Sequence, residues 1–268
     1  MDAEHKGKLV IIGGAEDKKG DCVILRKVAE LAGESEGKIV IMTVATEYPS
    51  KVGAEYKKLF EKLHIGNIDA LHIETRADAN DSDSLKRLDN ATCVFFTGGD
   101  QLKITSLLGG SKAGQLLNEM FENGLVIAGT SAGASVMSET MITSGNDDDA
   151  PKKCTVKMAP GLGMLKGAVI DQHFAQRGRV GRLLAAVAQN PNVLGIGIDE
   201  DTAIIVDDDT FEVIGSNAVT ILDGVNLSYT NVSESRPDDI LALTNIALHI
   251  LPDGYRFDMK KRIPLLGR

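Results

Sequence analysis

The sequence LVIAGTSAGA at Leu125–Ala134 is an apolar strand that runs into a glycine-flanked serine and then into small residues that open a helix. A buried strand followed directly by a helix is typical of a parallel sheet in an α/β fold. Glycines two positions on either side of Ser131 remove side chains that would clash with a tight turn. The spacing therefore predicts a strand-turn-helix unit that raises the Ser131 hydroxyl above the strand end. A serine that only caps the helix is the alternative.

Short apolar strands and amphipathic helices alternate along the rest of the chain. The expected strands are 8–12, 38–43, 70–73, 92–97, 125–128 and 168–170, and the expected helices lie at 22–32, 53–64, around 107 and 116–121, and at 177–190. In the last third, closely spaced strands at 193–198, 203–206, 212–214 and 218–222 indicate hairpins. The pattern predicts one three-layer α/β domain over residues 1–268. Its mostly parallel sheet would have helices on both faces and antiparallel strands added at its end.

Composition excludes several classes of protein. The chain has 268 residues, 43% hydrophobic and 25% charged, which is typical of a globular fold. A formal net charge of −9 disfavours nucleic acid as a partner. No apolar run reaches membrane-spanning length and the opening segment is polar, so we expect neither a membrane span nor a secretory signal. Three widely spaced cysteines, Cys22, Cys93 and Cys154, favour a reducing compartment and hence a cytoplasmic location.

A nucleophilic serine needs a base, and one histidine is placed to supply it. His173 follows an apolar stretch at the end of an expected strand, where α/β folds gather their functional groups. The other histidines lie in polar, amphipathic or alternating stretches that are typical of structural histidines. They are His5, His64, His72 and His249.

A base in turn needs an acid, and the turn Asp199-Glu200-Asp201 offers three. Alternation along the preceding strand separates Glu200 from its two neighbours, but it does not say which side faces His173. A solvated acidic turn is the alternative. The turn at Gly98-Gly99 could supply a second backbone N–H to an oxyanion hole. A phosphate-binding loop is the competing interpretation, but the turn lacks the spacing of such a loop.

Arg177, Arg179 and Arg182 follow the histidine in a chain that is otherwise net acidic. Guanidinium groups could bind an anionic ligand here, or they could fold back onto nearby carboxylates. The tracts Asp147–Asp149 and Asp207–Asp209 lack the spacing of a calcium loop, so we expect solvated loops and no metal ion. No cofactor motif is present either, so none is expected.

Five segments, in their order and spacing, resemble the cyanophycinase family. They are GGAED at Gly13–Asp17, FTGGDQ at Phe96–Gln101, GTSAGA at Gly129–Ala134, DQHFAQRGRVGR at Asp171–Arg182 and GIDEDTA at Gly197–Ala203. That family is related to peptidase E and, more distantly, to class I glutamine amidotransferase domains. The resemblance implies an amidotransferase-like fold, a homodimer and a serine exopeptidase. Its substrate would be cyanophycin, a poly-aspartate backbone with arginine on each β-carboxyl, and its product β-Asp-Arg dipeptides.

The resemblance also implies residue roles. Ser131 would be the nucleophile, His173 the general base and then acid, and Glu200 the acid that orients His173. The N–H groups of Gly99 and Ala132 would form the oxyanion hole. The implied substrate pocket consists of Gln101, Asp171, Gln172, Arg177 and Arg182.

Two other functions compete with this interpretation. A peptidase E-like dipeptidase for α-linked Asp-X would share the serine chemistry. A non-catalytic module with the same fold could instead use the arginines to bind an acidic peptide. A glutamine amidotransferase would carry a cysteine where this chain carries Ser131.

Overall fold

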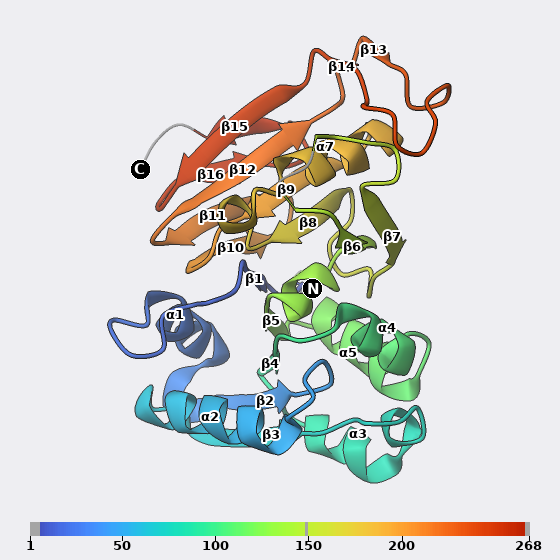
Figure 1. Cartoon of the computed structure of the whole chain (residues 1–268). Coiled ribbons are helices and arrows are strands. Elements are labelled where there is room, and N and C mark those ends of the chain that lie inside the picture. Colours follow the sequence, from blue (N-terminus) through green and yellow to red (C-terminus); the bar gives the residue numbers. More distant parts are fainter. Residues whose placement is uncertain (1–5, 148–149, 266–268) are drawn as a thin grey trace, which may run out of the picture.

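The computed structural model describes residues 6–147 and 150–265, and its centre is a nine-stranded sheet (Figure 1). Five parallel strands form one half of this sheet, and the apolar runs of all but the edge strand are buried because both faces are covered. In spatial order they are β1 (Leu9–Ile12), β5 (Val126–Thr130), β4 (Cys93–Phe96), β2 (Lys38–Met42) and the edge strand β3 (Asn67–Leu71).

Helices cover both faces of this parallel half, as the sequence predicts. Val10 and Ile12 of β1 face the cluster with α1 (Val23–Ala32) and α2 (Pro49–Lys62), whereas Leu9 and Ile11 face the opposite cluster. The helices on that second face are α3 (Ser82–Leu88), α4 (Gln101–Leu108), α5 (Lys112–Glu122) and α6 (Ala132–Ser135). Within the described ranges, no helix has the length and apolar character that crossing a bilayer requires.

Four antiparallel strands extend the sheet beyond β1. They are β10 (Thr202–Asp207), β11 (Thr210–Gly215), β16 (Arg256–Asp258) and β17 (Ile263–Leu265). β10 and β11 form the hairpin expected from the sequence, and β10 pairs antiparallel with every residue of β1.

The other expected C-terminal strands differ from the prediction, because they belong to a second sheet. β9 (Leu194–Ile198) and β12 (Ala218–Asp223) combine with β8 (Ala168–Gln172) and β15 (Ala247–Pro252) in the order β15-β12-β9-β8. Apolar residues of this sheet share one buried cluster with the antiparallel half of the main sheet, while α7 (Val180–Gln189) covers its other face. Gly195 and Gly197 of β9 permit this arrangement, because a Cβ on either would meet side chains of α7 or Phe174 within 2.8 Å.

Two short pairs of strands complete the structure. The sequence pattern did not predict them. They are β6 (Thr140–Gly145) with β7 (Val156–Pro160), and β13 (Tyr229–Thr230) with β14 (Leu243–Thr244).

The helix α6 starts directly after β5 and packs closely over the neighbouring strand β4. A Cβ on Gly133 would lie 2.4 Å from the carbonyl oxygen of Phe96, and a Cβ on Gly129 would lie 2.5 Å from the carbonyl oxygen of Gly133. These two glycines therefore set how closely α6 can approach the sheet. Ser131 lies between them.

Gly133→Ala should destabilise the fold, because its methyl group meets backbone that cannot move aside. We expect the free energy of unfolding to fall by about 1–3 kcal/mol, measured by urea denaturation. Gly98→Ala is the matched control, since its Cβ would have no neighbour nearer than 3.4 Å. Equal midpoints for the two variants would contradict the close packing of α6.

Candidate active site

Ser131 occupies a strained turn between β5 and α6. Its backbone has φ 54° and ψ −111°, a combination that costs a non-glycine residue about 1–3 kcal/mol. Its N–H donates to the carbonyl oxygen of Ile12, 3.1 Å away, which ties the turn to the end of β1. The turn places the Ser131 side chain beyond the carboxyl ends of the parallel strands.

His173 follows the last residue of β8 and reaches the same end of the main sheet. Its backbone also has a positive φ, 49°, and its N–H donates to the carbonyl oxygen of Gly13 over 2.8 Å. The imidazole lies against Gly14, where a Cβ would come within 2.3 Å of the ring. Gly14 therefore makes room for His173, a role that the sequence did not suggest.

A chain of contacts joins Ser131, His173 and Glu200. The Nε2 atom of His173 lies 3.1 Å from Ser131 Oγ, and its Nδ1 atom lies 2.7 Å from Glu200 Oε1. An ionised Glu200 accepts a hydrogen bond from Nδ1–H, which leaves Nε2 free to accept the serine proton.

The structure distinguishes Glu200 from the two aspartates beside it. Asp199 accepts hydrogen bonds from the N–H groups of Ala175 and Ala218. Asp201 accepts from the N–H of Asp17 and the hydroxyl of Ser216. Neither aspartate contacts the imidazole, so the orientation that periodicity left open favours Glu200.

His173 is largely buried, and this changes its basicity. Burial lowers the pKa of the imidazole because it disfavours the charged form. The hydrogen bond to Glu200 opposes this effect, and the nearby Arg177 guanidinium lowers the pKa further. His173 is therefore held neutral to a lower pH than a free histidine.

The Gly98-Gly99 loop borders Ser131. A Cβ on Gly98 would lie 3.9 Å from Ser131 Oγ, and Gly99 has φ +142° with its α-carbon against the carbonyl group of Ala45. Within the part of the chain that the structure describes, neither the N–H of Gly99 nor that of Ala132 donates a hydrogen bond. Two free donors thus stand close to the serine.

Three buried charged residues form a cluster next to His173. Arg182 donates two hydrogen bonds to Asp171, from Nε over 2.7 Å and from Nη2 over 2.5 Å. Arg179 donates to the carbonyl oxygen of Gln172 over 2.6 Å and to Asp147 over 2.8 Å. Arg179 and Arg182 therefore fold back onto carboxylates, the second of the two outcomes that the sequence allowed.

The remaining charged residues of this region differ in their surroundings. The guanidinium group of Arg177 is exposed and has no hydrogen-bond or ion-pair partner among residues 6–147 and 150–265, although the backbone N–H of Arg177 donates to the carbonyl oxygen of His173. Asp147 was expected in a solvated loop, but it pairs with Arg179 because the β6–β7 connection lies against α7. Asp148 and Asp149, like His5, lie outside the described residues.

Two glutamines of the implied substrate pocket lie on different sides of this region. The Oε1 atom of Gln172 is 3.5 Å from Ser131 Oγ. Gln101, at the start of α4, donates from Nε2 to the carbonyl oxygens of Ile142 and Thr143 over 3.1 and 2.8 Å. Gln101 thus attaches β6 to the Gly98-Gly99 loop.

One buried acid near Ser131 was missed by the sequence analysis. Glu16 accepts hydrogen bonds from Tyr56 over 2.5 Å and from Thr130, the residue before Ser131, over 2.6 Å. No local pattern marks Glu16, because it stands in a polar loop and its partners are 40 and 114 positions away.

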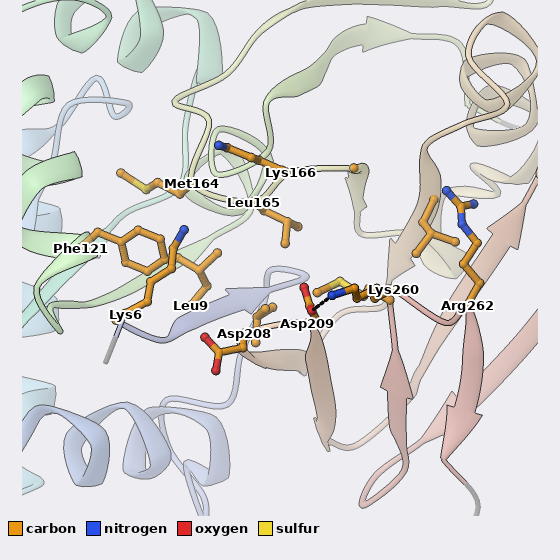
Figure 2. Close-up of a pocket in the computed structure, with 15 residues that line it drawn as sticks. Lys6, Leu9, Phe121, Met164, Leu165, Lys166, Asp208, Asp209, Lys260 and Arg262 are labelled. Atoms are coloured by element: carbon orange, nitrogen blue, oxygen red, sulfur yellow. Dashed lines mark ion pairs between the residues drawn. The ribbon is translucent and has the colours of Figure 1, made fainter. Parts of the chain in front are cut away.

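A cavity of about 680 Å³ lies at the opposite, amino-terminal end of the parallel strands and contains none of these residues. Figure 2 shows it beside Leu9, the first residue of β1, with Lys6 and Phe121 at one end and Arg262 at the other. Ser131 follows the carboxyl end of β5, which runs parallel to β1. The length of these strands therefore separates this cavity from Ser131.

Comparison with known proteins places the chain in a family. The model of peptidase family S51 matches residues 9–214. The chain is 38% identical over 264 residues to a cyanophycinase of Geminocystis herdmanii (strain PCC 6308), covering 98% of this chain and 97% of that one. It is also 38% identical over 262 residues to a cyanophycinase of Trichormus variabilis (strain ATCC 29413 / PCC 7937), covering 97% and 88%.

Two solved structures share the fold. A peptidase from an acI-B1 Actinobacterium superposes with a TM-score of 0.72 at 19% identity, covering 96% of this chain and 98% of that one. A putative peptidase E protein from Listeria monocytogenes EGD-e gives a TM-score of 0.54 at 16% identity, covering 79% and 100%. The family match and the near full-length relatives agree: the chain belongs to peptidase family S51 and is a serine-type peptidase.

Proposed function

We propose that this protein is a cyanophycinase, an exopeptidase that hydrolyses cyanophycin to β-Asp-Arg dipeptides through an acyl-enzyme on Ser131. The contact chain from Ser131 through His173 to Glu200 is the observation that carries the chemistry. The substrate is inferred from the relatives named cyanophycinase, which match nearly the whole chain at 38% identity.

Ser131 Oγ attacks the backbone carbonyl carbon of the substrate while His173 Nε2 takes the hydroxyl proton. The tetrahedral intermediate then collapses. His173 gives its proton to the leaving amine, and the acyl part remains on Ser131 as an ester. In the second half of the reaction His173 deprotonates a water molecule, which attacks the ester and releases the acid and the free serine.

The turn at Ser131 would act as a nucleophile elbow, with the oxyanion stabilised by the N–H groups of Gly99 and Ala132. The unused donors of both residues support this assignment. Such a pair stabilises the negative charge that develops on the carbonyl oxygen, and each donor contributes about 3–4 kcal/mol to the transition state.

The substrate pocket is assigned to Gln101, Asp171, Gln172, Arg177 and Arg182, with different tasks. Arg177 is exposed beside His173 and can pair with a substrate carboxylate. Arg182 and Asp171 are already paired with each other, so we assign them to holding β8 and its Gln172 in place. Gln172 would then contact the substrate next to the reacting bond.

The proposal extends to the organisation of the protein. A single domain is supported by the buried cluster that joins the two sheets. The family resemblance supports a homodimer, and the cysteine usage supports a cytoplasmic location. The net charge of −9 favours neither nucleic acid nor an anionic membrane surface as a partner.

Ser131→Ala should abolish release of β-Asp-Arg from insoluble cyanophycin, because no other group can form the ester. We expect kcat to fall by about 10⁴-fold or more, with unchanged circular dichroism, measured by mass analysis of the soluble products. An α-linked Asp dipeptide serves as the competing substrate. Cleavage of that dipeptide alone by the wild type would favour a peptidase E-like activity. Cleavage of neither substrate would favour a binding module.

Glu200→Gln should lower kcat by about 10²–10⁴-fold, because the amide can no longer stabilise the imidazolium that forms during catalysis. Steady-state kinetics on a soluble cyanophycin fragment would measure this loss. Asp201→Asn is the matched control, since Asp201 does not contact His173. A loss in the control equal to that in Glu200→Gln would remove Glu200 from the role proposed for it.

The dependence of kcat/KM on pH should report the lowered pKa of His173. Activity falls as pH falls through this pKa, because the protonated imidazole cannot accept the serine proton. We expect the midpoint of this acidic limb below the ordinary value of 6.5. Arg177→Gln should move this midpoint to higher pH, because it removes a positive charge that lowers the pKa of His173. Arg26→Gln, on the distant α1, should leave the midpoint unchanged. A midpoint unmoved by Arg177→Gln would contradict the electrostatic coupling.

A further inference from the structure

A second, smaller cavity of about 200 Å³ opens beside Ser131. It is lined by the loop after β1, by α2 and by the residues around the serine turn. None of its lining residues comes from β8 or α7, the elements that carry the Asp171–Arg182 pair. The cavity is therefore separate from the pocket assigned above, yet whatever occupies it lies against the reacting bond.

Glu16 forms the buried floor of this cavity. Its side chain is 1% exposed, and its two oxygens accept hydrogen bonds from Tyr56 and Thr130. The ammonium group of Lys18 lies 3.3 Å from the same carboxylate. Because its oxygens are already occupied by these partners, Glu16 positions its neighbours and is not itself available to a ligand.

Lys18 and Glu55 are the charged residues at the mouth of the cavity. The Lys18 ammonium lies 4.3 Å from the centre of the Tyr56 ring, and its side chain is 40% exposed. An ammonium group has three N–H donors, so the contact with Glu16 leaves donors for a ligand. Glu55 is exposed on α2 and has no ion-pair partner in the described part of the chain.

We propose that this cavity binds the part of the substrate that leaves when Ser131 is acylated, and that it selects a leaving residue carrying both a carboxylate and a cation. Lys18 pairs with the carboxylate and Glu55 with the guanidinium or ammonium group. The inference rests on the proposed function, because it assigns the acyl part of the substrate to the pocket beside Gln172 and Arg177. The cavity and the region of Gln172 and Arg177 then correspond to the two sides of the scissile bond.

The test compares two substrates with the same acyl part. One is the dimer of β-Asp-Arg, which has a single backbone amide and a zwitterionic leaving unit. The other is the α-methyl ester of β-Asp-Arg, whose leaving group is methanol. Lys18→Gln and Glu55→Gln should each lower kcat/KM for the dimer by about three- to fivefold, and the double variant by about tenfold or more. Hydrolysis of the ester should stay within about twofold of the wild type, because methanol does not use the cavity.

The double variant Lys19→Gln/Glu61→Gln is the matched control. It removes the same two charges from neighbouring positions that do not line the cavity, so it should hydrolyse both substrates as the wild type does. Equal losses on dimer and ester for the Lys18 and Glu55 variants, or no loss on the dimer, would overturn the inference while leaving the serine mechanism intact. A wild-type protein inactive on both substrates would instead overturn the proposed function and the inference with it.

Discussion

The close packing of α6 against β4 and β5 is the constraint on which the rest of the site depends. Gly129 and Gly133 allow backbone to meet backbone there, and this contact holds Ser131 in a conformation that an isolated peptide would avoid. The hydrogen bond from Thr130 to the buried Glu16 anchors the strand on one side of the turn. Strain at Ser131 persists because the surrounding structure fixes the backbone on both sides of it.

The buried charges next to His173 hold that residue in place. Asp171, Arg179 and Arg182 connect β8 to α7 and to the β6–β7 connection. Removing one partner of a buried ion pair costs about 3–5 kcal/mol, since the other charge is left unpaired. Arg179 and Arg182 therefore stabilise the segment that carries His173. Of the three arginines in this segment, only the exposed Arg177 does not pair with a carboxylate of the described residues.

Periodicity predicted the parallel half of the main sheet well. Strands such as Leu9–Ile12 and Cys93–Phe96 are short apolar runs between amphipathic helices, and both faces of the sheet require this pattern. It did not predict the second sheet. Strands β9 and β10 are equally apolar, and nothing local shows that β9 pairs with β8 while β10 pairs with β1. Strand partners are chosen by contacts between distant segments, which alternation does not record.

The sequence by itself determined the strand-turn-helix unit at Ser131 and made His173 the favoured partner among five histidines, because glycine spacing and position at a strand end are local properties. Alternation left the choice among Asp199, Glu200 and Asp201 open, and the family resemblance pointed to Glu200. The tertiary structure then brings Glu200 into contact with the imidazole. It also decided that Arg179 and Arg182 are paired internally and that Glu16 lies beneath the serine turn. Side-chain direction and long-range pairing depend on how the two sheets pack, and a single sequence carries that information only through the complete fold.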